Sequence, residues 1–171
     1  MNQEAEMTDA MTPRKAIEFA IKTEELGTKF YQQLALKFSD QPELKELFEL
    51  LAKDEIMHEA QFRRLLEKTP PDEGVSTGPE FQYLRAMSLS QFFMGQDGLK
   101  RKSKEIEDEN DALGVAFELE KATLGYYSAM REVLGASDTL DGVIEAEKAH
   151  LTKVMQYIIT DAKFRGLADK W

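Results

Sequence analysis

The chain contains only two histidines, His58 and His150, and each follows a glutamate by three residues, Glu55 and Glu147. On an α-helix, residues three apart lie on the same face, so each pair directs a carboxylate and an imidazole toward one point. Oxygen and nitrogen donors in this arrangement supply half of a metal site. Because the pair occurs twice, the sequence predicts two matching halves of one site, provided that the fold brings them together.

Apolar residues recur every three or four positions in four stretches of the chain, which predicts four helices. The glutamate–histidine pairs lie inside the apolar stripes of the second and fourth helices, at positions where ordinary packing would place leucine. A lone histidine in such a stripe is usually a hydrogen-bonded core residue, but the adjacent glutamate favours a ligand. The predicted helices cover residues 13–38, 42–67, 111–134 and 139–160. Expected boundary signals are Thr12 with Pro13, a capping box of Asp40 and Glu43, Gly135, and Ser137 or Asp138.

A single glutamate also interrupts the apolar stripes of the first and third helices, at Glu24 and Glu120. A buried, unpaired carboxylate costs several kcal/mol, so each of these side chains needs a cation, a hydrogen-bond network or an escape to solvent. The alternative is that Glu24 merely borders a polar edge marked by Glu25. A tyrosine follows each stripe glutamate by seven residues, Tyr31 and Tyr127, which is two helical turns or about 10 Å.

The two halves of the chain superimpose at offsets of 96 for the first pair of helices and 92 for the second. This duplication predicts two helical hairpins related by a pseudo-twofold axis, with four carboxylates and two imidazoles meeting in mid-bundle. Two divalent ions would neutralise the four negative charges. We therefore predict an all-α fold: an antiparallel four-helix bundle with a long crossover, residues 68–110, between helices 2 and 3. Within one domain of residues 1–171, the crossover carries a short helix at 80–93 and a solvated charged run at 100–109, and residues 161–171 form a tail.

The amino-acid composition excludes several classes of binding partner and of catalytic chemistry. The chain has no cysteine, which excludes thiol catalysis, disulfides and iron–sulfur or zinc–thiolate sites within it. Its net charge of -10 opposes binding to nucleic acid and to anionic membranes. No apolar run approaches the length needed to span a bilayer, and the first eleven residues are unlike a targeting peptide. We expect a cytoplasmic protein that binds neither nucleic acid nor membranes.

The whole constellation resembles the ferritin-like di-iron carboxylate superfamily, and the local sequence resembles its rubrerythrin branch. Residues 16–35, 43–66, 111–130 and 143–154 carry the likeness, which leaves out the crossover. The resemblance implies that Glu55 and Glu147 are bridging ligands and that His58 and His150 each bind one metal. It also implies that Glu24 and Glu120 are terminal ligands and that Tyr31 and Tyr127 are outer-sphere residues.

Two departures from the rubrerythrin pattern bear on activity. Typical rubrerythrins have a seventh ligand, a glutamate, where this chain has Thr123, and they carry a cysteine-ligated rubredoxin domain. The resemblance implies two iron ions, with manganese or zinc as alternatives, that reduce peroxide or dioxygen. Without cysteines, the electrons must come from an external donor such as rubredoxin or a flavoprotein reductase.

Two other functions fit the sequence, namely a ferritin-like protein that oxidises and stores iron, and a metal-free helical interaction protein. Storage requires a closed shell of many subunits, whereas a peroxide-reducing bundle needs only a small oligomer, for which we expect a homodimer. Several aromatic residues supply a candidate interface, or simply cover the end of the bundle: Phe81, Phe92, Phe93, Phe164 and Trp171.

Overall fold

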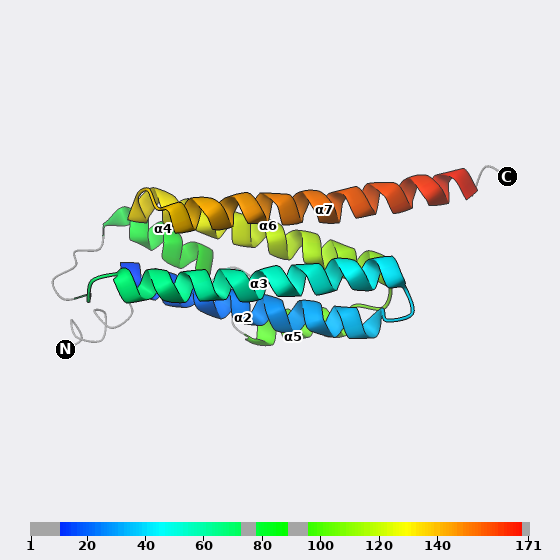
Figure 1. Cartoon of the computed structure of the whole chain (residues 1–171), viewed down its shortest axis with the longest axis horizontal. Coiled ribbons are helices and arrows are strands. Elements are labelled where there is room, and N and C mark those ends of the chain that lie inside the picture. Colours follow the sequence, from blue (N-terminus) through cyan, green and yellow to red (C-terminus); the bar gives the residue numbers. More distant parts are fainter. Residues whose placement is uncertain (1–10, 73–77, 89–95, 169–171) are drawn as a thin grey trace.

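Four long helices pack side by side in the computed structural model, and the predicted antiparallel bundle is confirmed (Figure 1). The structure describes residues 11–72, 78–88 and 96–168, and of residues 96, 97 and 161–168 only the backbone. The long helices are α2 (Pro13–Lys37), α3 (Pro42–Lys68), α6 (Glu109–Leu134) and α7 (Asp138–Ala168).

The helix boundaries follow from local chemistry, with one correction. Thr12 caps α2 by accepting a hydrogen bond from the backbone N–H of Lys15, and Gly135 ends α6 at a φ of 87°. The predicted capping box of Asp40 and Glu43 is wrong. Pro42 occupies the first helical position of α3, so the N-cap residue is Gln41 and Asp40 lies one residue too early to cap the helix. The side chain of Gln41 makes no capping hydrogen bond.

The last helix is longer than the sequence predicted. We expected it to end near Thr160 and to be followed by a tail, but α7 runs to Ala168 and extends past the ends of its neighbours (Figure 1). Residues 161–168 contain no proline, and the lone glycine among them lowers helix stability without stopping a helix. Trp171, which we assigned to the tail, lies outside the described residues.

The crossover between α3 and α6 contains two short helices, α4 (Pro79–Ser88) and α5 (Gln96–Lys104). It spans the bundle, so that α6 runs parallel to α3, as predicted (Figure 1). Helix α4 packs on α6, and Phe81 is buried there, covering the bundle rather than offering an interface. The predicted helix at 80–93 ends at Ser88 in the described residues, and Phe92 and Phe93 lie outside them.

Two apolar clusters fill the bundle, and each draws on all four long helices. One cluster contains Phe48 and Leu113, and the other contains Ile17 and Met130. Along every long helix, the predicted ligand positions fall between the residues of one cluster and those of the other. The fold therefore places a polar layer between two dry layers.

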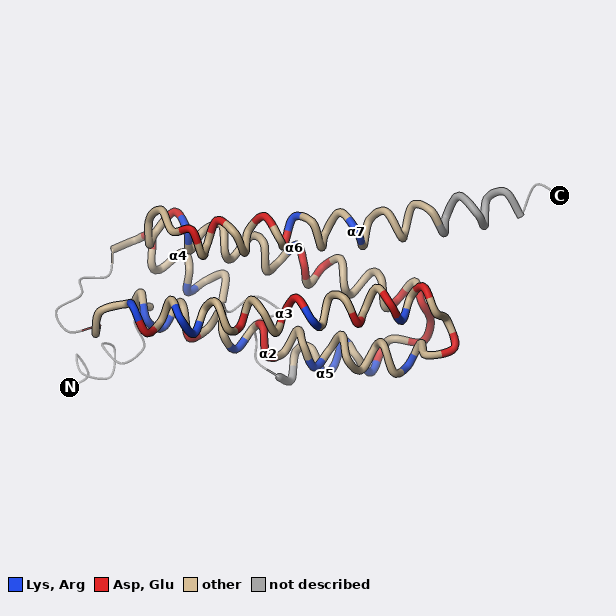
Figure 2. Tube along the Cα trace, in the orientation of Figure 1, with Lys and Arg blue, Asp and Glu red and all other residues tan. Residues whose placement is uncertain are grey.

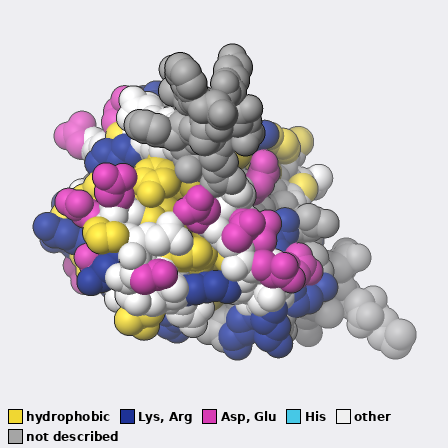
Figure 3. Space-filling model, turned by 90° about the vertical axis from the view of Figure 1, so that its right-hand side faces the viewer, with side chains coloured by type: hydrophobic (Ala, Val, Ile, Leu, Met, Phe, Trp, Pro, Cys, Tyr) yellow, Lys and Arg dark blue, Asp and Glu magenta, His cyan; other side chains and the backbone are white. Residues whose placement is uncertain are grey.

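The outer surface is strongly charged. Acidic residues are spread along the long helices, and basic residues mark α5 (Figure 2). On the end where α2 meets α3, charges of both signs are interspersed, basic side chains gather at the lower edge, and no histidine is visible (Figure 3). Among the described helices, we find no segment with the length and apolar character of a membrane span.

Candidate metal centre

Six side chains converge in the polar layer between the two apolar clusters, and we call them the glutamate–histidine cluster. All of them are buried, with at most 4% of any residue's surface exposed. Helices α2 and α6 contribute one glutamate each, and α3 and α7 contribute one glutamate and one histidine each. The members are Glu24, Glu55, His58, Glu120, Glu147 and His150.

The alternative position for Glu24, at a polar edge of α2, does not occur. Glu24 has no exposed surface, whereas the neighbouring Glu25 is partly exposed and pairs with Lys22 and Arg63 at 2.6 and 2.8 Å. These two cations lower the pKa of Glu25, the hydrogen bond from Lys22 having the largest effect. Of these two neighbouring carboxylates, Glu25 thus lies at the surface and Glu24 in the core.

The cluster divides into two sets of four donors that share two residues. One set holds Glu24 and His58, the other holds Glu120 and His150, and both contain Glu55 and Glu147. The donor atoms within each set lie within 4.8 Å of one another. The two shared glutamates are the ones to which the resemblance gives a bridging role. Two adjacent cations with two carboxylates between them match this division.

The donors approach one another without forming hydrogen bonds. His58 Nδ1 lies 2.8 Å from Glu147 Oε1, and His150 Nδ1 lies 3.4 Å from Glu120 Oε2, yet all four atoms lack a hydrogen-bond partner. Such atoms are rare in a protein core, because each one left unsatisfied costs about 1–3 kcal/mol or more if charged. Nitrogen and oxygen atoms that face a common point without bonding to each other fit a shared metal ion.

Burial and mutual repulsion disturb the ionisation of the cluster. Burial raises the pKa of Glu55, and Glu24 and Glu147 add to the effect. Burial likewise raises the pKa of Glu147, helped by Glu120 and Glu24. For His150, burial alone would lower the pKa, but Glu120 and Asp54 outweigh burial and leave it raised. The raised pKa values of Glu55, Glu147 and His150 favour bound protons at these three groups, and binding of divalent cations would displace such protons.

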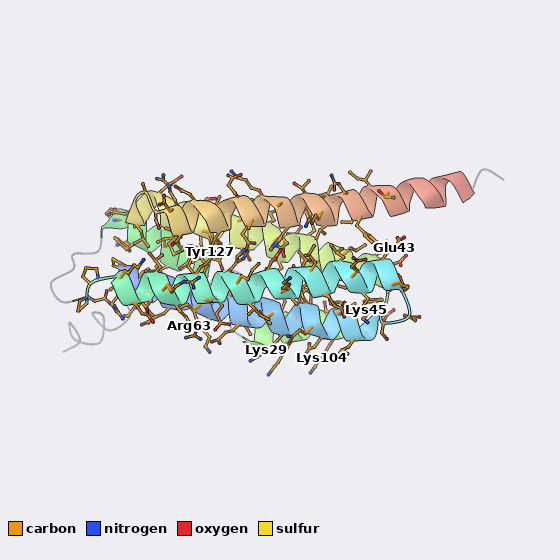
Figure 4. All side chains as sticks on the ribbon, in the orientation of Figure 1. Lys29, Glu43, Lys45, Arg63, Lys104 and Tyr127 are labelled. Carbon is orange, nitrogen blue, oxygen red and sulfur yellow. The ribbon has the colours of Figure 1, made fainter. Side chains whose placement is uncertain are left out.

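Each predicted outer-sphere tyrosine bonds to a glutamate of the opposite hairpin. The hydroxyl of Tyr31 donates to Glu120 Oε1, and that of Tyr127 donates to Glu24 Oε1. Figure 4 shows Tyr127 inside the bundle, while Lys29 and Lys104 lie on its outer side. Each bonded carboxylate keeps its second oxygen, Oε2, without a partner. Each tyrosine thus fixes Oε1 of one carboxylate by a hydrogen bond and leaves Oε2 of that carboxylate available to another partner in the cluster.

Two further residues shape the cluster, and sequence reasoning missed both. Asp54 Oδ2 lies 3.0 Å from His150 Nε2, on the side of the ring opposite the cluster. Gly27 leaves room for Glu55, since a Cβ at this position would meet Glu55 Oε2 at 2.8 Å. The signals were present in the sequence, because Asp54 precedes Glu55 and Gly27 follows Glu24 by three residues.

Thr123, which stands where the resemblance implies a seventh carboxylate ligand, has no carboxylate to offer the cluster. Its hydroxyl donates to the backbone carbonyl of Leu119, one turn earlier in α6. Among the described residues, the candidate donor groups together comprise six side chains.

Comparisons with known proteins point to one family. A family model described as Rubrerythrin matches residues 15–158, which includes all six residues of the cluster. Searches against curated proteins and against solved structures gave no match.

Proposed function

The chain belongs to the rubrerythrin family, and from this premise we propose that it is a di-iron oxidoreductase that reduces peroxide or dioxygen with electrons from a separate donor protein. The observation that carries the proposal is the buried pair of donor sets sharing Glu55 and Glu147. A packed core tolerates four carboxylates in one layer only when cations or protons balance them.

The donor chemistry suits iron. Carboxylate and imidazole donors without thiolates favour iron or manganese, and they also bind zinc, which has no redox chemistry. Glu24 and His58 would hold one ion, Glu120 and His150 the other, and Glu55 and Glu147 would contact both. Two bound ferrous ions would supply the two electrons that reduction of a peroxide bond requires.

The chain's own contribution is a pre-arranged set of donor atoms in a dry core. The apolar clusters on both sides exclude water, which strengthens electrostatic interactions inside. Tyr31 and Tyr127 fix the orientation of the terminal carboxylates through their hydroxyl hydrogen bonds. Burial raises the pKa of both hydroxyls, and Glu120 and Glu24 raise the pKa of Tyr31 and Tyr127 further, so these protons stay in place at neutral pH.

Protons and electrons must both reach the centre. Reduction of hydrogen peroxide to two waters consumes two electrons and two protons. The two tyrosine hydroxyls keep their protons in hydrogen bonds to Glu120 and Glu24 and so orient these carboxylates, while the two protons consumed come ultimately from water. No residue of the 171 is a cysteine, so this chain builds no iron–thiolate centre that would relay electrons. A separate redox protein is required for turnover.

The test is a comparison of single and repeated turnover. In iron-loaded protein that has been reduced chemically and freed of reductant, the iron should be oxidised once when hydrogen peroxide is added. The absorption spectrum of the protein monitors this oxidation. Continuous peroxide consumption should appear only after rubredoxin and its nicotinamide-dependent reductase are added. A Glu55→Ala, Glu147→Ala double variant, carried through the same steps, should show neither reaction.

Two outcomes would contradict the proposal. Reduced, iron-loaded protein that reacts with neither peroxide nor dioxygen would exclude the redox function. Uptake of many ferrous ions per chain during aerobic loading, with a large assembly seen by light scattering, would identify iron storage instead.

A further inference from the structure

The two histidines of the cluster are equivalent in the duplicated fold but differ in their surroundings. Their rings lie side by side, with centroids 5.4 Å apart and planes inclined by 29°. Each ring turns Nδ1 toward the glutamates, at 2.8 Å from Glu147 for His58 and at 3.4 Å from Glu120 for His150. Each therefore turns Nε2 away from them.

Only one of the two outward nitrogens meets a carboxylate in the described part of the chain. His150 Nε2 lies 3.0 Å from Asp54 Oδ2, which reaches across from α3. The charged groups near the His58 ring, Glu24 and Glu147, both face its Nδ1. The offset of 92 that relates the hairpins carries Asp54 onto position 146, where the chain has Ala146.

A carboxylate at Nε2 changes what Nδ1 can do. It accepts a hydrogen bond from Nε2–H, which holds the proton on Nε2 and so favours the tautomer whose lone pair is on Nδ1, the atom that faces the cluster. It also orients the ring and makes Nδ1 a stronger donor to a metal. Loss of such a partner typically weakens metal binding about 10- to 100-fold. Within the described residues His58 has no such carboxylate partner, so the two donor sets are unequal although their ligand types match.

We propose that the two metal positions differ in affinity, that the position at His150 fills first, and that Asp54 is the positioning residue that sets this order. The inference rests on the proposed metal centre and adds a singly loaded state to it, with the ion at His150 and the His58 position open. The second ion, held by His58 without an outer carboxylate, is then the one that leaves first under chelation.

The test is a titration of metal-free protein with manganese(II), in which the electron paramagnetic resonance signal counts the free ion. Wild-type protein should bind two ions in two steps separated by about 10- to 100-fold in affinity. His58→Ala should keep the tight step and lose the weak one, and His150→Ala should do the reverse.

Asp54 and Ala146 provide matched variants. Asp54→Ala should weaken the tight step about 10- to 100-fold and merge it with the weak one, and Asp54→Asn, which keeps a neutral acceptor, should fall between. Ala146→Asp gives His58 the same partner and should tighten the weak step. Lys53→Ala, an exposed neighbour of Asp54, should change neither step.

The outcomes separate this inference from the metal centre itself. Two equal steps in wild-type protein, or loss of the tight step in His58→Ala, would overturn the inference and leave the centre intact. An unchanged tight step in Asp54→Ala would overturn the role of Asp54. Absence of any manganese binding by wild-type protein would overturn the inference together with the centre on which it rests.

Discussion

Replacing Gly27 by alanine should have opposite effects on the metal-free and metal-loaded protein. Gly27 lies inside α2, where glycine destabilises a helix by about 0.5–1 kcal/mol relative to alanine. The added Cβ would lie 2.8 Å from Glu55 Oε2 and 3.3 Å from the carboxylate carbon, closer than ordinary contact. The substitution therefore improves the helix and crowds Glu55, the proposed shared ligand.

Without metal, Glu55 is a flexible side chain whose far end can move by a few tenths of an ångström. We expect Gly27→Ala to raise the free energy of unfolding of the metal-free protein by up to about 1 kcal/mol, which corresponds to roughly 2–4 °C in Tm for a chain of this size. With metal, the proposed bridging role would fix the Glu55 carboxylate between two ions, so that it could not retreat. Affinity for the ions should fall about 10- to 100-fold, the usual effect of disturbing the support of a ligand.

Thermal melting of the metal-free protein and manganese(II) titration measure the two effects separately. Gly114→Ala is the matched control, because Gly114 lies in helix α6 and a Cβ added there would have no atom within 4 Å, so only the helix gain applies. Metal binding by Gly27→Ala as tight as that of Gly114→Ala would refute the assignment of Glu55 as a shared ligand. A Tm well below wild type in the metal-free state would refute the claim that Glu55 can move aside.

Three further predictions concern the same cluster. Alanine at His58 or His150 should remove one of two bound ions and alanine at Glu55 or Glu147 should remove both, as elemental analysis after dialysis would show; unchanged stoichiometry would contradict the ligand assignment. Leucine at all four cluster glutamates, combined with phenylalanine at Tyr31 and Tyr127 so that no hydroxyl loses its acceptor, should leave a fold that melts no lower than metal-free wild type, since apolar replacement of a buried charge cluster is often neutral or stabilising; a markedly lower Tm would mean that these carboxylates make further structural bonds. The Tm of metal-free protein should fall as pH rises from about 5 to 8, because the raised pKa values of Glu55, Glu147 and His150 mean that the folded state binds more protons than the unfolded one and loses that advantage as these groups deprotonate. A rising Tm over this range would contradict that linkage, and the variant with leucine at the four glutamates should show a weaker dependence.

The bundle and the convergence of the six residues could be predicted because each residue broke an otherwise regular pattern. A glutamate such as Glu120 in an apolar stripe is expensive, so its position carries information that a leucine there would not. The repeat of Glu-x-x-His then related the two hairpins. Helix periodicity and the duplicated spacing together placed these side chains at one level of the bundle.

Contacts between hairpins could not be predicted in the same way. The spacing of Glu24 and Tyr31 along one helix suggested no bond between them, and the structure instead pairs each tyrosine with the glutamate of the other hairpin. Asp54 escaped notice because its counterpart is Ala146, so a search for repeated residues passes over it. The end of α7 was misplaced because no proline or capping residue marks it.

The most direct test of the dinuclear centre is the iron content of the protein after anaerobic loading with ferrous iron and removal of excess by gel filtration. We predict two ions per chain in wild-type protein, and none in the variant with leucine at all four cluster glutamates, measured while both remain folded by circular dichroism. Iron bound equally by the two proteins, or absent from wild type, would contradict the central claim that this cluster is a dinuclear metal centre.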